Sequence, residues 1–151
     1  MASLFDLLKQ YGKLDKQELL RIAKNAYRTF DQSSNRNGNR DFVAHMIGYV
    51  AYNADIKITQ QEYKFFQVVT GYTYNSFEEF KRTFRNHQML EPSERLFQFM
   101  RQHFSMQSKV ALLQICLCLC VIDGISSFER GYLQSLFGYD VTEAYDSYAQ
   151  M

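Results

Sequence analysis

Three cysteines at alternate positions, followed by acidic residues, could bind a metal or carry redox chemistry. They lie in the segment CLCLCVIDGISSFE, which runs from Cys116 to Glu129. On a helix, Cys116 and Cys120 lie on one face and Cys118 on roughly the opposite face, so the three thiols do not converge on one ion. Zinc sites usually use closely spaced cysteine pairs on turns, with a second pair elsewhere. We therefore predict that these cysteines are small apolar core residues.

Four carboxylates follow the two most apolar segments of the chain. Asp55 and Glu62 follow one segment, and Asp123 and Glu129 follow the other. Carboxylate oxygens are the ligands that Ca²⁺ and Mg²⁺ prefer, so two equivalent turns could form one divalent-cation site. Helix capping explains the same residues without a ligand, because Asp bonds nearby backbone amides and Glu completes a capping box. Both interpretations stay open, and no cofactor is assigned with certainty.

The remaining candidates for catalysis are sparse. His45, His87 and His103 are scattered, with no metal-binding pair and no evident nucleophile beside them. The seven glycines occur singly, so no glycine-rich phosphate-binding loop is present. We therefore predict that the protein is not an enzyme.

Composition and charge indicate a globular protein and disfavour general binding to nucleic acid. The chain has 151 residues, of which 46% are hydrophobic, 16% aromatic and 22% charged, which suits one domain with its own core. Lysine and arginine number 17 against 16 aspartates and glutamates, a net charge of +1. No general affinity for nucleic acid is expected from this balance.

The sequence predicts neither a secretion signal nor membrane insertion. The N-terminal stretch MASLFDLLKQYGKLDKQE lacks a basic region followed by a long apolar run. The longest nearly apolar run, VALLQICLCLCVI, has 13 residues, fewer than the roughly 20 of a membrane-spanning helix. We expect a cytoplasmic protein whose cysteines are reduced.

The elements that would position these residues are helices. Leu19, Ala23, Ala26 and Phe30 form one of several apolar stripes with helical spacing, and no segment alternates as a half-buried strand does. Capping boxes in DKQE, TQQE, SFEE and SSFE mark four helix starts. One long polar connection is expected over 31–41. The predicted helices are 2–11, 16–30, 41–54, 60–70, 77–87, 93–104, 106–122, 127–137 and 141–149.

Two segments of the chain are similar enough to predict an internal duplication. Residues 43–72 and 110–139 both begin with Val-Ala, run through an apolar helix to an Asp, and then place a Ser or Thr cap three residues before a Glu. Each closes on Gly-Tyr, at Gly71 and Gly138, where a helix C-cap requires a positive φ. The cysteine segment should therefore be helical, apolar all round and the most buried helix. The predicted fold is one all-α domain over 1–151, with about seven to nine helices and two pseudo-symmetric helix-turn-helix repeats.

These repeats resemble those of the TerB-like family. The resemblance covers residues 41–139 and is carried by ADIKITQQE, by IDGISSFE, and by the connecting segment FEEFKRTF. The family includes the tellurite-resistance protein TerB and the N-terminal region of the co-chaperone DjlA. The resemblance implies an all-α fold and, in some members, acidic residues that bind divalent cations. It implies no known reaction.

Aromatic residues are the last feature with a functional interpretation. The 11 tyrosines and 13 phenylalanines exceed what a helical core needs, so some should lie at the surface, where they suit a protein partner. Residues 71–84 interleave aromatic and basic side chains, which could also suit single-stranded nucleic acid, although the charge balance disfavours this. The leading hypothesis is a non-enzymatic module for protein interaction or stress response, with an unidentified protein partner and an open oligomeric state. The alternative is a Ca²⁺- or Mg²⁺-binding protein that uses Asp55, Glu62, Asp123 and Glu129.

Overall fold

The all-α prediction is confirmed by a computed structural model of the chain. The model describes residues 3–34, 38–55, 59–85, 90–124 and 133–149, and every regular element within these ranges is a helix. Residues 133–137 are helical as well. The other helices are α1 (Leu4–Gly12), α2 (Lys16–Ser34), α3 (Asn39–Asp55), α4 (Gln60–Thr70), α5 (Phe77–Arg85), α6 (Leu90–His103), α7 (Met106–Asp123) and α9 (Tyr139–Tyr148).

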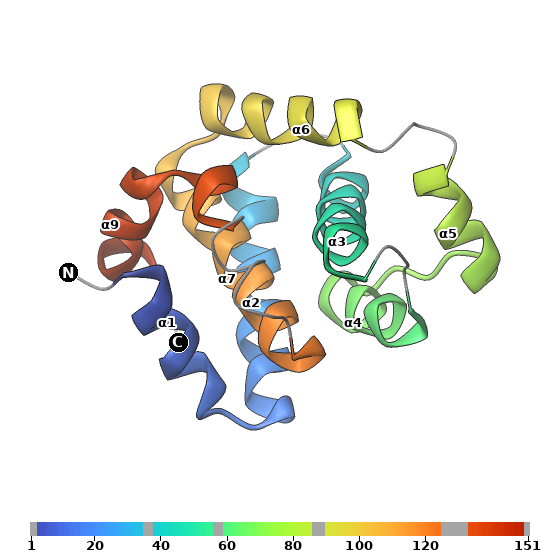
Figure 1. Cartoon of the computed structure of the whole chain (residues 1–151), viewed down its shortest axis with the longest axis horizontal. Coiled ribbons are helices and arrows are strands. Elements are labelled where there is room, and N and C mark those ends of the chain that lie inside the picture. The colour runs from blue at the N-terminus through green and yellow to red at the C-terminus, as the bar shows by residue number, and fades with distance from the viewer. Residues whose placement is uncertain (1–2, 35–37, 56–58, 86–89, 125–132, 150–151) are drawn as a thin grey trace.

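The helices are arranged around a central pair, α2 and α7. Figure 1 shows α1 and α9 on one side of this pair, α3, α4 and α5 on the other, and α6 across one end. Helix α2 packs most extensively against α7, and α7 also contacts α1, α3, α4 and α9. Every residue from 110 to 120 is buried. The prediction that the CLCLC stretch lies on a buried helix is therefore confirmed.

The three cysteines are core residues, as the sequence predicts. Cys116, Cys118 and Cys120 are all buried, and all three are free thiols. Their neighbours along α7 are isoleucine, leucine and valine, which suits the weakly polar thiol group. None of the described helices combines the length and the apolar character needed to cross a membrane.

A buried polar network fixes α1 and α9 on the central helix. The hydroxyl groups of Tyr11 on α1 and Tyr145 on α9 lie 2.6 Å apart, and the Gln114 side-chain amide of α7 donates to the Tyr11 hydroxyl at 3.2 Å. Gln114 is the one polar residue in the apolar run of α7 between residues 110 and 120. Because the tyrosine hydroxyl satisfies its amide, Gln114 is tolerated in the core, and the position of α9 is specified.

The long polar connection predicted over 31–41 is wrong in its extent. Helix α2 continues to Ser34 and α3 begins at Asn39, so the helices take up most of this stretch. The Asn39 side-chain amide donates to the Asp31 carboxylate at 2.9 Å, and the hydroxyl groups of Ser33 and Ser108 lie 2.6 Å apart. Side-chain hydrogen bonds thus stabilise the additional helical residues of α2 and α3. The spacing of hydrophobic residues, on which the prediction depended, gives no information about such bonds.

Capping residues begin the helices largely as predicted. The Asp15 carboxylate accepts from the Glu18 amide at 2.8 Å, and the Ser76 hydroxyl accepts from the Glu79 amide at 3.1 Å. A further capping box, Ser3 with Asp6, was missed because the prediction required glutamate at the third helical position. The predicted box at SSFE lies outside the described residues.

Both glycines that close the predicted repeats have a positive φ. Gly71 is a left-handed C-cap with φ 73°, and Gly138 has φ 88°. A side chain at either position would strain the backbone, so glycine is favoured there. The turn of the second repeat lies outside the described residues, and the pseudo-symmetry of the two repeats stays a prediction.

The interleaved aromatic segment, 71–84, comprises the connection from α4 to α5 and most of α5 itself. The rings of Tyr63 and Phe80 stack with centroids 4.7 Å apart, and Phe66 contacts Tyr74 at 5.7 Å and Phe80 at 5.4 Å. These rings form a continuous cluster, which we call the aromatic cluster. Its members are Tyr63, Phe66, Tyr72, Tyr74, Phe77 and Phe80.

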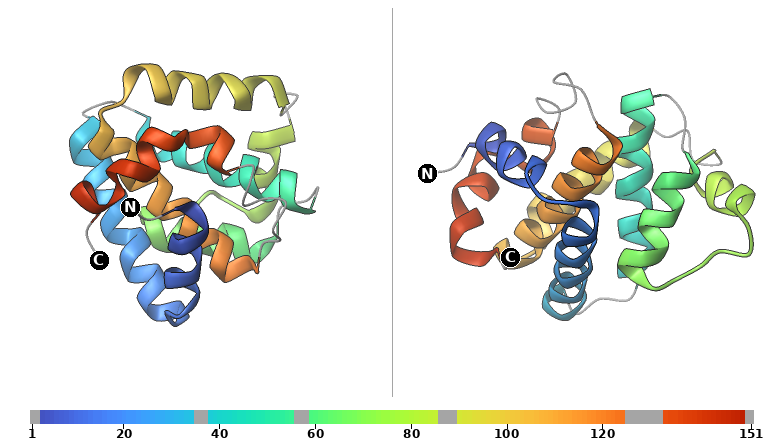
Figure 2. Two further views of the ribbon diagram at one scale, coloured as in Figure 1. Left: turned by 60° about the vertical axis from the view of Figure 1, so that its left-hand side comes forward. Right: turned by 90° about the horizontal axis from the view of Figure 1, so that it is seen from below.

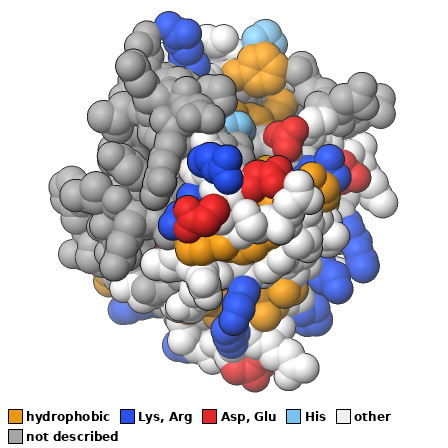
Figure 3. Space-filling view, turned by 90° about the vertical axis from the view of Figure 1, so that its right-hand side faces the viewer, with side chains coloured by type: hydrophobic (Ala, Val, Ile, Leu, Met, Phe, Trp, Pro, Cys, Tyr) orange, Lys and Arg blue, Asp and Glu red, His pale blue; other side chains and the backbone are white. Residues whose placement is uncertain are grey.

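Charged side chains around the aromatic cluster are engaged within the molecule. The Lys81 ammonium group lies 2.9 Å from the Glu78 carboxylate and 4.7 Å from the Phe77 ring centroid. The Arg40 guanidinium lies 3.6 Å from the Tyr72 ring centroid. On the side of the molecule seen in Figure 3, acidic and basic side chains of the described residues are intermixed around hydrophobic ones. The aromatic residues of 71–84 thus pack α5 against α4, while Lys81 is engaged within α5 itself.

Candidate functional site

The structure describes only part of the acidic site predicted from sequence. Asp55 is the last residue of α3 and Asp123 is the last residue of α7, so each ends a helix at the expected turn. The side chains of both residues, and the whole of Glu129, lie outside the described residues. Of the four proposed ligands, Glu62 is the one whose side chain is described.

Glu62 forms a complete capping box at the start of α4. Its Oε1 accepts from the Thr59 backbone amide at 2.5 Å, and the Thr59 hydroxyl accepts from the Glu62 amide at 3.3 Å. Only 2% of Glu62 is exposed. The helix cap therefore accounts for this buried carboxylate, because a backbone donor satisfies it.

A divalent-cation site is neither supported nor overturned by these positions. In the described part of the chain, no three His, Cys, Asp or Glu side chains are grouped so that they could hold a metal ion. Since three of the four proposed carboxylates are outside that part, a Ca²⁺ or Mg²⁺ site at the turns stays a prediction.

Two substitutions separate the capping role of these residues from a ligand role. Thr59→Ala should lower the free energy of unfolding by about 0.5–2 kcal/mol because α4 loses its cap, whereas Glu62→Gln should cost less since glutamine can also complete a capping box. With capping alone, millimolar Ca²⁺ or Mg²⁺ leaves the melting temperature of the wild type and of both variants unchanged. A cation-dependent rise in the wild type and in Thr59→Ala, lost in Glu62→Gln, would assign the carboxylate to a metal site.

The start of α4 lies next to the end of α7 in the fold. The Gln61 side-chain amide, in the first turn of α4, donates to the Ile122 carbonyl near the end of α7 at 3.3 Å. Beside this hydrogen bond a groove of about 420 Å³ opens between α2, α4 and the end of α7. We call it the α2–α4 groove. Its lining residues are Lys16, Leu20, Gln61, Lys64, Phe65, Val68 and Ile122.

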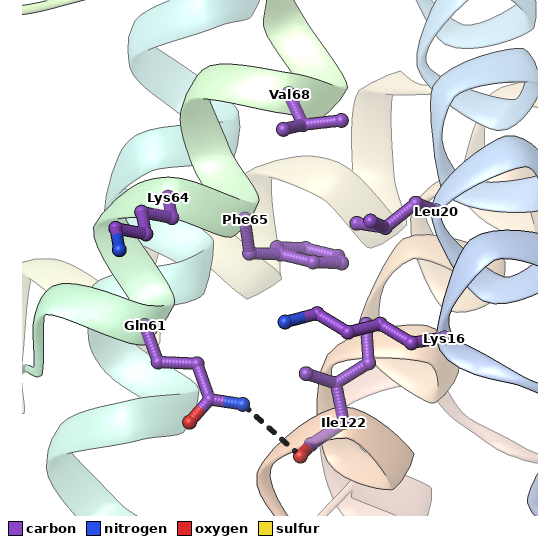
Figure 4. A pocket seen from close by; sticks show the side chains of 7 residues that line it. All are labelled: Lys16, Leu20, Gln61, Lys64, Phe65, Val68 and Ile122. Atoms are coloured by element: carbon purple, nitrogen blue, oxygen red, sulfur yellow. Dashed lines mark hydrogen bonds between the residues drawn. The ribbon is translucent and has the colours of Figure 1, made fainter.

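The α2–α4 groove has an apolar floor. Figure 4 shows Leu20 of α2 facing the Phe65 ring of α4, with Ile122 below and Val68 above them. Phe65 is buried, Leu20 and Ile122 are partly buried, and Val68 is 43% exposed. A concave apolar surface of this volume lies within the roughly 300–1,000 Å³ of typical ligand pockets.

The rim of the groove carries positive charge. Lys16, the first residue of α2, extends toward α4 across the groove, and Lys64 lies on the outer edge of α4 (Figure 4). Both lysines are exposed, and neither has a carboxylate partner among the described residues. The N-terminal ends of α2 and α4 add positive helix-dipole potential there, but the C-terminal end of α7 opposes it, so the positive charge of the rim comes from the two lysines. The arrangement favours a ligand that is apolar in its centre and acidic at its edge.

This groove was missed by the sequence analysis because its walls are distant in sequence. Lys16 occurred only inside a capping box, and Gln61 occurred only as a residue between a cap and its glutamate. Tertiary packing of α2 against α4 is what brings them together. The local patterns in the sequence carried no signal for it.

Comparison with known proteins adds no function to this geometry. No family model, curated protein or solved structure matches the chain. The TerB-like resemblance stays a prediction, and the case for a function depends on the groove.

Proposed function

We propose that the protein is a non-enzymatic interaction module whose α2–α4 groove binds an amphipathic helix bearing acidic residues. The observation that carries this proposal is the pairing of an apolar floor with two lysines that have no acidic partner among the described residues. Amphipathic helices bind such grooves through apolar side chains spaced at three and four residues. Acidic residues beside those anchors would meet Lys16 and Lys64.

Each part of the groove has a separate role in this proposal. Apolar side chains of the partner contact Leu20, Phe65 and Val68, and most of the binding energy comes from this contact. The lysines select acidic partners and speed association, because exposed charges act mainly through long-range attraction. Binding should therefore weaken as the salt concentration rises. The stress-response role implied by the TerB-like resemblance is compatible with a module of this kind.

The test uses two synthetic peptides of equal length and equal apolar pattern. Both are amphipathic helices with leucines along one face, and they differ in carrying glutamates or lysines beside the leucines. Fluorescence anisotropy of the labelled peptides should show micromolar binding of the acidic peptide and at least about tenfold weaker binding of the basic one, a difference of about 1.4 kcal/mol. Equal binding of the two peptides, or no binding of either, contradicts the proposal.

Substitutions assign the binding to the α2–α4 groove. Lys16→Glu with Lys64→Glu should weaken binding of the acidic peptide about tenfold or more, since two attractive contacts become repulsive. The matched control, Lys13→Glu with Lys24→Glu, makes the same change in net charge at exposed positions that do not line the groove. If the control weakens binding as much as the groove variant, the peptide responds only to the overall charge.

A further inference from the structure

Helix α9 presents a surface of the opposite chemistry to the α2–α4 groove. Tyr139 is 75% exposed, and Asp140, Glu143 and Asp146 are exposed beside it. The sequence of α9, YDVTEAYDSY, contains no lysine or arginine. Its solvent-facing side is therefore both aromatic and acidic.

The exposed residues of α9 lie in one row. Tyr139, Glu143 and Asp146 are at positions i, i+4 and i+7, which share a face of an α-helix. On the opposite face Val141 is buried, and the Tyr145 hydroxyl lies 2.6 Å from that of Tyr11 on α1. The row is thus held on a rigid helix. No ordering of the helix is needed before it binds, which lowers the entropic cost of association.

We propose that this face of α9 occupies the α2–α4 groove of a second copy of the chain. Tyr139 would enter the apolar part of the groove, while Glu143 and Asp146 would lie near Lys16 and Lys64. This inference rests on the proposed function, because it names an acidic helix that the groove receives, with the exposed Tyr139 as its single aromatic anchor. Tyrosine is a frequent anchor residue of protein interfaces, since its ring is large and loses little conformational freedom.

The contact must join two molecules, because α9 and the groove are apart within one. Figures 1 and 2 show α9 on one side of the central pair and α4 on the other. Helix α9 packs against α7, whereas the groove opens between α2 and α4. A surface that binds a different surface of an identical molecule gives head-to-tail assembly, either an open chain or a closed ring. The net charge of +1 offers little repulsion between copies.

Sedimentation velocity of the full chain measures this assembly directly. The weight-average sedimentation coefficient should rise with protein concentration through the micromolar range. Tyr139→Ala, which alters a side chain that makes few contacts within its own molecule, should weaken the association at least tenfold without lowering the melting temperature. A wild-type chain that stays monomeric at all concentrations overturns the inference.

A charge exchange between the two surfaces tests their pairing. The α9 variant Glu143→Lys with Asp146→Lys, and the groove variant Lys16→Glu with Lys64→Glu, should each stay monomeric, because each presents two surfaces of like charge. An equimolar mixture of the two should assemble, since each surface again meets its opposite. Assembly of either variant alone to the wild-type extent, or a mixture that remains monomeric, overturns the proposed pairing.

The sedimentation and peptide experiments can fail independently, so they test the self-assembly and the proposed function separately. A monomeric wild type that still binds the acidic peptide shows that the groove receives a helix of another protein, so the inference fails and the proposed function holds. If the wild type assembles through α9 and the groove, the acidic peptide should compete with assembly and lower the sedimentation coefficient. Absence of competition would place the α9 contact outside the groove and overturn the inference.

Discussion

Replacing Phe66 with alanine is expected to lower the free energy of unfolding by about 3–5 kcal/mol, the usual cost of removing a buried phenylalanine ring. Phe66 of α4 is 0% exposed and lies at the centre of the aromatic cluster. Its ring centroid is 5.4 Å from that of Phe80, 5.7 Å from Tyr74 and 6.4 Å from Tyr72. Truncation leaves a cavity between α4 and α5 that the surrounding rings cannot fill without moving. Urea denaturation followed by circular dichroism measures the loss.

Phe5→Ala is the matched control for this substitution. Phe5 also lies on a helix, α1, but 52% of it is exposed, and the Lys9 ammonium group is 5.0 Å from its ring centroid. Its truncation removes an exposed ring and a weak cation–π contact, which should cost less than about 1 kcal/mol. Similar losses in the two variants would contradict the burial of Phe66 and the structural role of the aromatic cluster.

A large loss of unfolding free energy in Phe66→Ala would also help to identify the surface that binds a partner. The sequence of 71–84 suggested an aromatic surface available to a partner, whereas Tyr74 contacts Phe66, Tyr72 and Phe80 within the molecule. Rings that pack against one another to join two helices leave less of their surface for a ligand. The α2–α4 groove, by contrast, has exposed lysines without acidic partners among the described residues. The proposed function therefore depends on α2 and α4, and the aromatic segment supports α4 from its other side.

The sequence predicted those features of the fold that depend on local interactions. The bounds of α4 agree with the predicted 60–70, because Thr59 and Glu62 define its start and Gly71 its end. The burial of α7 was predicted because its apolar residues cover its whole circumference. In both cases the deciding sequence pattern lies within one helix or within one turn of its end.

Features that depend on contacts between distant segments were not predicted. The extension of α2 depends on Ser33 meeting Ser108 and on Asp31 meeting Asn39. Gln114 interrupts an apolar pattern, and its partner Tyr11 lies 103 residues away in the sequence. The α2–α4 groove likewise combines residues from three helices. Hydrophobic periodicity and capping motifs describe one helix at a time, so they cannot predict which residues of different helices come into contact.

The candidate cation site shows how one motif can have two explanations. Asp55 and Asp123 end helices and Glu62 caps α4, as the capping interpretation predicts, whereas Glu129 lies outside the described residues. The same positions suit a cap and a metal ligand, because both roles require an oxygen near a helix end. Only the cation dependence of the melting temperature separates the two roles.

Raising the pH from about 8 to about 10 is expected to lower the free energy of unfolding, because buried thiol and tyrosine hydroxyl groups resist losing their protons. Burial raises the pKa of the Cys118 thiol from 9.0 to about 12, against a smaller opposing effect of a hydrogen bond with the Ala23 backbone. Burial also raises the pKa of Cys116, and it raises the pKa of Tyr11 and of Tyr145 above 10.0. All four groups stay protonated in the folded chain at a pH where the unfolded chain releases their protons.

The sign of the effect follows from proton linkage. Below about pH 9 both states keep the Cys118 proton, so its contribution to stability is fully present. Between about pH 9 and pH 12 the unfolded chain binds fewer protons than the folded chain, and the free energy of unfolding falls as the pH rises. For Cys118 alone the loss reaches about 1.4 kcal/mol at pH 10. The tyrosines add to the loss as the pH exceeds 10.0, the usual pKa of their hydroxyl groups.

A comparison with Cys118→Ala isolates the contribution of one thiol. The substitution leaves a small cavity, which lowers stability by a similar amount at every pH and so does not change the pH dependence. Exposed lysines and the remaining buried groups titrate alike in both proteins. Urea denaturation at about pH 8 and about pH 10 should therefore give a loss that is about 1.4 kcal/mol smaller in the variant than in the wild type. Equal losses would mean that Cys118 ionises as readily in the folded chain as in the unfolded one, which contradicts its burial between α2 and the other helices around α7.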